Sequence, residues 1–287
     1  MLSVIAAAQG GFSLNPGPLF ILLPITVAYV VRWRAVGAHP FRLVLFMLGM
    51  TAAVAALFTP IDTLGDDLLA MHMVQHLLML DIAPVLCLLG LTKAIFRPAT
   101  KRVIQLERSR FRWILSPKTG LIAYIGGMWF WHWPTMYNAA VEHTGVHVLE
   151  HLTFTFIGAI YWWHLISPVR DQRQLSGMGA VLYMATTKIG VGILGIGLTF
   201  VPESIYDVYQ LPGGALNLWG MTAQEDQALA GVIMATEQSI VMGIALVYLV
   251  VQAIDRSEKE QLRIEKYGDP KRPKAPAGSP PPSRELY

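Results

Sequence analysis

The sequence has little charge for its length. Of its 287 residues, 14% are Asp, Glu, Lys or Arg, whereas 54% are hydrophobic, and the mean hydropathy is +0.46. A soluble domain usually carries about 25% charged residues. Charge this scarce excludes an ordinary water-soluble domain, because too few side chains are available to face water. We therefore predict a protein that lies largely within a lipid bilayer.

Cysteine is almost absent as well. The single cysteine, Cys87, lies inside an apolar run. One thiol excludes both an internal disulfide framework and a Cys-x-x-Cys site. The His-Glu-x-x-His motif of zinc hydrolases is also missing. These absences exclude a disulfide-stapled secreted domain and give no support to a zinc protease.

Seven apolar runs are long enough to cross a membrane. A helix of about 20 residues spans the hydrocarbon core, which is about 30 Å thick. Backbone groups in lipid must be paired within their own segment, so each run should be helical. The runs lie at 17–34, 41–59, 68–92, 120–137, 145–167, 179–201 and 227–254. The predicted fold class is an all-α membrane protein, a bundle of seven transmembrane helices.

Basic residues alternate between the connecting segments. The loops after the first, third and fifth runs and the C-terminal tail hold every Lys and Arg except Lys188. The positive-inside rule then predicts an outer N-terminus and a cytoplasmic C-terminus. We expect an outer N-terminal segment (1–16), a seven-helix membrane domain (17–254) and a basic, proline-rich cytoplasmic tail (255–287). The tail should be disordered towards its end.

Six of the eight histidines fall near the predicted outer ends of three runs. His72 and His76 are four residues apart, so they share one helix face. His147 and His151 repeat that spacing. A lone histidine in a membrane helix usually serves packing, but ionisable residues gathered at one depth are costly and favour a functional interpretation. The remaining members of the six are His132 and His143.

These histidines favour a metal site. Imidazole binds Cu, Zn, Fe and Ni, and a His and Met set without cysteine suits copper in either oxidation state. Thioethers lie nearby, although a single methionine more often fills the core. Glu150 could orient an imidazole. The candidate ligands are His72, His76, His147 and His151, and the weaker candidates are His132, His143, Met79 and Glu150; neighbouring thioethers are Met71, Met73, Met128 and Met136.

Other interpretations of the cluster stay open. A b-type cytochrome would need two histidines on opposite sides of a haem iron, hence from different helices. A membrane metalloenzyme ranks below it. Asp81 and Lys188 have opposite charge near the middle of their runs, and we interpret them as a structural ion pair, with a proton path as the alternative. Glu237 could reach the histidines or bond a neighbouring helix.

The segment MHMVQHLLM at residues 71–79, followed by Ala83-Pro84 and Leu89-Gly90, resembles the signature of the CtaG family of multi-spanning cytochrome c oxidase assembly factors. The resemblance covers most of residues 17–252. The sequence departs from the family pattern at Ala230-Gly231, where two glycines are expected, and at Met234-Ala235-Thr236, where a Met-Trp pair is expected. Other agreeing stretches are Thr59-Pro60-Ile61-Asp62, His132 with Pro134 and Tyr137, His147 and His151 with Gly158 and Trp162-Trp163, and Asp226.

The resemblance implies a role in making active cytochrome c oxidase, through copper supply, and implies no enzymatic activity. Implied partners are an oxidase subunit or other assembly factors, together with the lipid bilayer, and no nucleic acid. The implied location is the bacterial plasma (inner) membrane, which the chain would cross several times. Copper ligation by the histidines is inferred from their chemistry, and the oxidase's binuclear copper centre lies on the same outer side as the predicted cluster.

Overall fold

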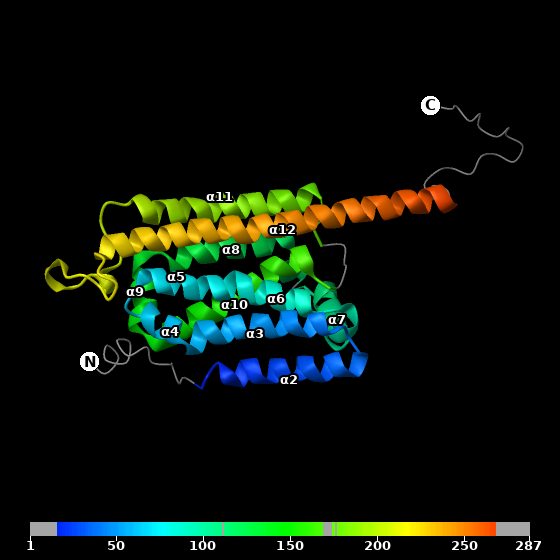
Figure 1. Ribbon diagram of the computed structural model, residues 1–287, viewed down its shortest axis with the longest axis horizontal. Helices are drawn as coiled ribbons and strands as arrows, with labels where there is room; N and C mark the ends of the chain where they lie inside the picture. The colour runs from blue at the N-terminus through cyan, green and yellow to red at the C-terminus, as the bar shows by residue number, and fades with distance from the viewer. Residues whose placement is uncertain (1–15, 111, 169–173, 176, 268–287) are drawn as a thin grey trace, which may run out of the picture.

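The computed structural model describes residues 16–110, 112–168, 174–175 and 177–267. These residues contain helices, turns and loops and no strand. Figure 1 shows the long helices lying side by side along the longest axis of the molecule. The predicted outer segment at 1–16 and the end of the predicted tail at 268–287 lie, apart from residue 16, outside the described residues.

Long helices alternate with short helical turns along the chain. In order, the elements are α2 (Leu19–Val36), α3 (Pro40–Phe58), α4 (Pro60–Gly65), α5 (Leu69–Leu77), the π-helix η1 (Leu78–Ile82), α6 (Ala83–Gly90), α7 (Lys93–Arg108), the 3-10 helix η2 (Arg112–Leu115), α8 (Pro117–Trp131), α9 (Pro134–Glu142), α10 (Thr144–Ile166), α11 (Met178–Phe200), the 3-10 helices η3 (Asp207–Tyr209) and η4 (Pro212–Gly214), and α12 (Ala223–Tyr267).

Five helical stretches in the described residues are long and apolar enough to cross a membrane. They are α2, α3, the continuous stretch Leu69–Gly90, α11 and α12. Helix α10 matches the predicted run at 145–167 in extent, but it is not among the five. An all-helical membrane-type architecture is therefore established, whereas the count of seven spans and the orientation stay predictions.

The predicted single helix at 120–137 is wrong. Helix α8 ends at Trp131 and α9 begins at Pro134, with Trp133 in an extended backbone conformation between them. Proline has no N–H for a helical hydrogen bond and forces the preceding residue out of the helical region. The break leaves His132 at the C-terminal end of α8, where its position is set by the end of the helix.

The predicted run at 68–92 is helical but not uniformly α-helical. Leu78–Ile82 form a π-helical segment between α5 and α6. Such segments interrupt α-helices at functional sites more often than chance. Helix α10 packs against this segment at Gly158, where a Cβ atom would meet the backbone carbonyl of Leu80. Glycine at this position lets α10 approach closely to the helix that continues from α5 through η1.

Close packing through small residues also joins α11 to α12. A Cβ atom on Gly231 would meet the carbonyl oxygen of Gly195 and the backbone of Thr199. Small residues at this contact let the two helix backbones approach closely, as in many membrane helix pairs. Helix α12 continues past the predicted run end at 254, and pairs such as Lys259 with Asp255 line its charged extension.

Asp81 and Lys188 do not form the ion pair that we predicted. The Asp81 carboxylate accepts hydrogen bonds from Tyr124 Oη (2.8 Å) and Trp162 Nε1 (2.7 Å). Lys188 is exposed, and its Nζ donates to the hydroxyl of Ser239. Neutral donors on neighbouring helices thus satisfy the buried carboxylate, because opposite charge at similar depth does not fix which faces of two helices meet.

The two ends of the bundle differ. In Figure 1 the basic helix α7 and the charged extension of α12 lie at one end, and α4 and α9 lie at the opposite end. The histidine-bearing turns of α5 and α10 lie towards the α4 and α9 end. The charge asymmetry of the sequence therefore corresponds to two distinct ends of one helical bundle.

Candidate metal centre

Two helices supply the centre of the histidine cluster. Helix α5 carries His72 and His76, whose ring centroids are 4.3 Å apart, as expected for residues one turn apart on one face. Helix α10 carries His147 and His151, with ring centroids 4.1 Å apart. The two pairs meet, since the His72 and His147 rings lie 5.4 Å apart. The predicted convergence of these four side chains is observed in the structure.

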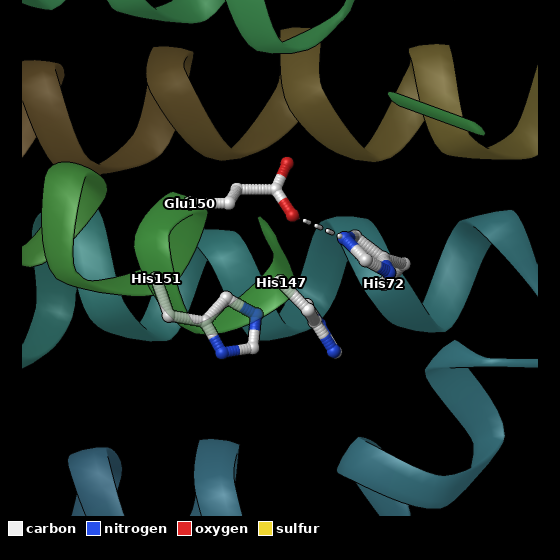
Figure 2. A group of neighbouring side chains, drawn as sticks. All are labelled: His72, His147, Glu150 and His151. Atoms are coloured by element: carbon white, nitrogen blue, oxygen red, sulfur yellow. Dashed lines mark ion pairs between the residues drawn. The ribbon is translucent and has the colours of Figure 1, made fainter. Parts of the chain in front are cut away.

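Four residues could hold one metal ion together. His72, His147, Glu150 and His151 each offer a ligand atom, and these atoms lie within 4.8 Å of one another. Figure 2 shows His72 reaching from α5 towards Glu150, while His147, Glu150 and His151 project from one region of α10. Glu150, a weaker candidate from the sequence, therefore lies at the centre of the group.

The polar atoms of this cluster are buried without hydrogen-bond partners. Glu150 is 0% exposed, His72 is 1% exposed and His76 is 3% exposed. Buried polar groups in proteins are nearly always hydrogen-bonded. The cluster atoms that lack a partner are both nitrogens of His72, both nitrogens of His76, both carboxylate oxygens of Glu150, and the Nε2 atoms of His147 and His151.

Glu150 stands between the two histidines of α5. Its Oε2 lies 3.5 Å from His72 Nε2, and its Oε1 lies 3.5 Å from His76 Nε2. Charge-assisted hydrogen bonds between nitrogen and oxygen are about 2.7–2.9 Å long. These separations are longer than such hydrogen bonds and are ion pairs only where the imidazole is protonated, so both carboxylate oxygens stay able to bind a cation.

His132 approaches the cluster from α8. Its Nδ1 lies 2.7 Å from the carbonyl oxygen of Met128, and its Nε2 lies 3.2 Å from Met73 Sδ. Its ring centroid is 6.1 Å from that of His76. His143, in contrast, is exposed at the junction of α9 and α10 and does not join the four-residue group. Five of the six predicted outer histidines thus lie together.

A cavity of about 500 Å³ adjoins the cluster. His147, His151 and the buried Met79 line it on one side. Asp62 and Asp66 line it as well, so carboxylates and imidazoles face one space. Burial and the nearby Asp62 carboxylate raise the pKa of Asp66 to about 6. A cation in this cavity would therefore meet acidic side chains next to the unpartnered nitrogens.

Comparison with known proteins agrees with this geometry. A family model described as cytochrome c oxidase caa3 assembly factor matches residues 27–256. The chain belongs to this family. It is also similar to an uncharacterized protein of Mycobacterium leprae (strain TN), at 22% identity in an alignment of 268 residues that covers 85% of this chain and 39% of that protein. The chain therefore spans well under half the length of that relative, and no solved structure matches it.

The match to the caa3 assembly factor family includes every residue of the cluster, because the matched residues run from 27 to 256. It also includes residues that sequence reasoning missed. Gln75, between the two histidines of α5, donates from Nε2 to Asp62 Oδ1 (2.7 Å) and to the Ala56 carbonyl (2.8 Å). A glutamine in the middle of an apolar run was the available signal. It anchors α5 to α3 and to α4, which carries Asp62.

Asp226 is a second positioning residue of this family member. The sequence marked it only through the family resemblance. In the structure it binds the first turn of α5 from α12, through contacts with Leu69 and Ala70. Its contribution depends on a tertiary contact between residues far apart in the chain, and no local pattern indicates such a contact.

Proposed function

We propose that this protein is a cytochrome c oxidase assembly factor that binds copper through His72, His147, Glu150 and His151 and supports copper-centre formation in the oxidase. The observation that carries the proposal is the convergence of buried, unpartnered nitrogen and oxygen atoms at one point. Each unsatisfied buried polar group costs about 1–3 kcal/mol. One coordinated cation would satisfy several of these groups at once.

The donor set suits copper. Three imidazoles and one carboxylate can bind several divalent ions, and copper binds such a site most tightly in the usual order of affinities. Membership of the caa3 assembly factor family supplies the biological context, an oxidase that contains copper. Copper is then the cargo that the protein passes on, and the protein itself is not an enzyme.

Location follows from charge. If the chain crosses a bacterial plasma membrane seven times with its basic loops in the cytoplasm, the cluster lies on the outer side. The acidic cavity wall formed by Asp62 and Asp66 would then draw cations from that side towards His147 and His151. The client would be an oxidase subunit whose copper centre forms on the same side.

A bis-histidine haem fits the arrangement less well. Haem iron takes one imidazole from each side of the porphyrin plane. In this cluster more than two imidazoles crowd together, with His72 in ring contact with both His76 and His147. Several nitrogens around one point favour a small ion over a flat macrocycle.

The test is metal analysis with an optical spectrum on the full chain, purified in detergent and loaded with copper. We expect near-stoichiometric copper in the wild type and no Soret band. Glu150→Gln keeps the size of the side chain but removes its charge, and copper affinity should fall about 10–100-fold. The His147→Ala/His151→Ala double variant should lose the ion. His143→Ala is the matched control, since His143 is an exposed histidine at the same end of α10.

The other outcomes are equally specific. A wild type that binds no copper at all would sink the copper proposal and leave an assembly factor that acts through contact alone. A Soret band would favour the cytochrome hypothesis, and iron or zinc without haem would favour the metalloenzyme hypothesis. In cells lacking the protein, the variants should restore copper in the oxidase in the same order in which they bind copper.

A further inference from the structure

The ring of His132 makes two polar contacts, and a neutral imidazole cannot make both of them as hydrogen bonds. Its Nδ1 lies 2.7 Å from the carbonyl oxygen of Met128, which can only accept, so we assign the ring proton to Nδ1. The neutral ring then has a bare lone pair on Nε2. That lone pair faces the thioether sulfur of Met73 at 3.2 Å. A thioether has no proton to donate, so two electron-pair donors meet with nothing between them.

His132 and Met73 form a buried pair. His132 and Met73 are 3% and 2% exposed, so bulk water does not reach them freely. The ring of His76 lies nearby, with its centroid 6.1 Å from that of His132; neither of its nitrogens has a hydrogen bond, and its Nε2 lies 3.5 Å from Glu150 Oε1. Met73, His76 and Met128 also line one small cavity. The Met73 sulfur thus contacts His132 Nε2, and Met73 also shares a cavity with His76.

This position differs from the four-residue group in place and in chemistry. Its donors come from α5 and from the end of α8, whereas His147 and His151 come from α10. It includes the Met73 sulfur, whereas the four residues of the first group offer imidazole nitrogens and a carboxylate. Thioether ligands select monovalent copper, while imidazole and carboxylate accept a wider range of ions.

We propose that Met73 Sδ, His132 Nε2 and His76 form a second, softer position that binds a monovalent copper ion beside the first one. The ion takes the place of the missing proton between the nitrogen and the sulfur. Glu150 joins the two positions, because its Oε2 faces His72 and its Oε1 faces His76. This inference rests on the proposed copper function, and it adds an ion and a sulfur ligand to it.

A metal site with nitrogen and oxygen ligands beside a site with a sulfur ligand suits a protein that carries copper to an oxidase. A carboxylate shared between neighbouring ions keeps them close and lowers their mutual repulsion. The chemical class of the second ligand is a monovalent soft cation, for which Ag(I) is a redox-inert probe.

The experiment uses the full chain in detergent, loaded without oxygen with Cu(I) and, separately, with Ag(I). Metal content per chain and X-ray absorption at the copper edge are the readouts. Met73→Leu conserves side-chain volume and costs under about 1.5 kcal/mol of stability. Its copper content should fall to about half, and the sulfur neighbour of copper should disappear from the absorption spectrum. Met184→Leu, which changes a buried methionine of α11, is the matched control.

The outcomes separate this proposal from the previous one. A wild type with one ion, no sulfur neighbour and no change in Met73→Leu would overturn the second position and leave the first intact; His132 would then be an imidazolium that donates to Met73. One ion with a sulfur neighbour would also overturn it, because a single site would then include Met73. No copper in any variant would end both proposals. Retention of the sulfur-bound ion in His147→Ala/His151→Ala would support two positions directly.

Discussion

The carboxylate of Asp226 on α12 accepts hydrogen bonds from the backbone N–H groups of Leu69 (2.8 Å) and Ala70 (3.1 Å) in the first turn of α5. The residue at the N-terminal boundary of α5, Leu68, has no side chain that could cap the helix itself. Helix α5 therefore receives its cap from another helix, and the capped helix is the one that carries His72 and His76.

This cap should stabilise both the fold and the metal site. Asp226→Ala should lower the free energy of unfolding by about 1–2 kcal/mol, because it removes a capping carboxylate from buried N–H groups. It should also weaken copper binding, since the start of α5 loses its anchor. Thermal unfolding and copper titration in detergent measure the two effects. A variant with unchanged stability would show that water or another group caps α5.

The contact between Gly158 and Leu80 should set the separation between α10 and the helix that runs from α5 through η1. Gly158→Ala places a methyl group against the Leu80 carbonyl, so α10 must move away from η1. We expect a loss of about 1–3 kcal/mol in stability and weaker copper binding. Gly192→Ala is the control, because nothing lies within 4 Å of its would-be Cβ. Equal stability of the two variants would contradict the close approach.

The Asp81 site should contribute to stability through hydrogen bonds and not through Lys188. Asp81→Leu leaves the buried Trp162 N–H without its acceptor and should cost about 1–3 kcal/mol. Lys188→Met should leave the contribution of Asp81 unchanged, since Lys188 bonds Ser239 and not Asp81. The double variant should then equal the sum of the two single effects. A coupling free energy above about 1 kcal/mol would restore the ion pair that the sequence suggested.

Asp66 should make stability depend on pH. Its pKa is raised from 3.8 to about 6 in the folded chain, so the folded state holds its proton over a range in which the unfolded chain has released it. The resulting stabilisation is complete below about pH 4 and is lost as the pH rises through about 6. Unfolding temperatures from pH 4 to 7 should fall more for the wild type than for Asp66→Asn. Parallel curves would place Asp66 in an ordinary solvated environment.

The parts of the site that follow a helical period could be predicted from the sequence. The spacing of His72 with His76 and of His147 with His151 determined which side chains share a face, and charge distribution indicated that these faces lie at one end of the bundle. The family resemblance was confirmed by the family match. Glu150 was recognised as a neighbour of the histidines, although its central place depended on how α10 turns towards α5.

What escaped prediction depends on contacts between helices. Opposite charge suggested that Asp81 pairs with Lys188, but helix rotation turns Asp81 towards Tyr124 and Trp162 instead. His143 has the right spacing, yet the start of α10 leaves it exposed. The break at Pro134 was visible as a residue type, and its effect was underestimated because apolar residues continue past it.

The π-helical segment η1 also changes the rotation of α5 relative to α6 about their common axis. A π-turn holds one more residue than an α-turn, and one residue corresponds to about 100° of helix rotation. The segment therefore acts as a phase shift between α5, which presents His72 and His76, and α6, whose Gly90 packs against Phe46 of α3. Helix α5 can therefore direct its histidines towards α10 while α6 keeps its packing against α3. Losing a single residue from η1 would turn one of these faces away from its partner without altering any ligand.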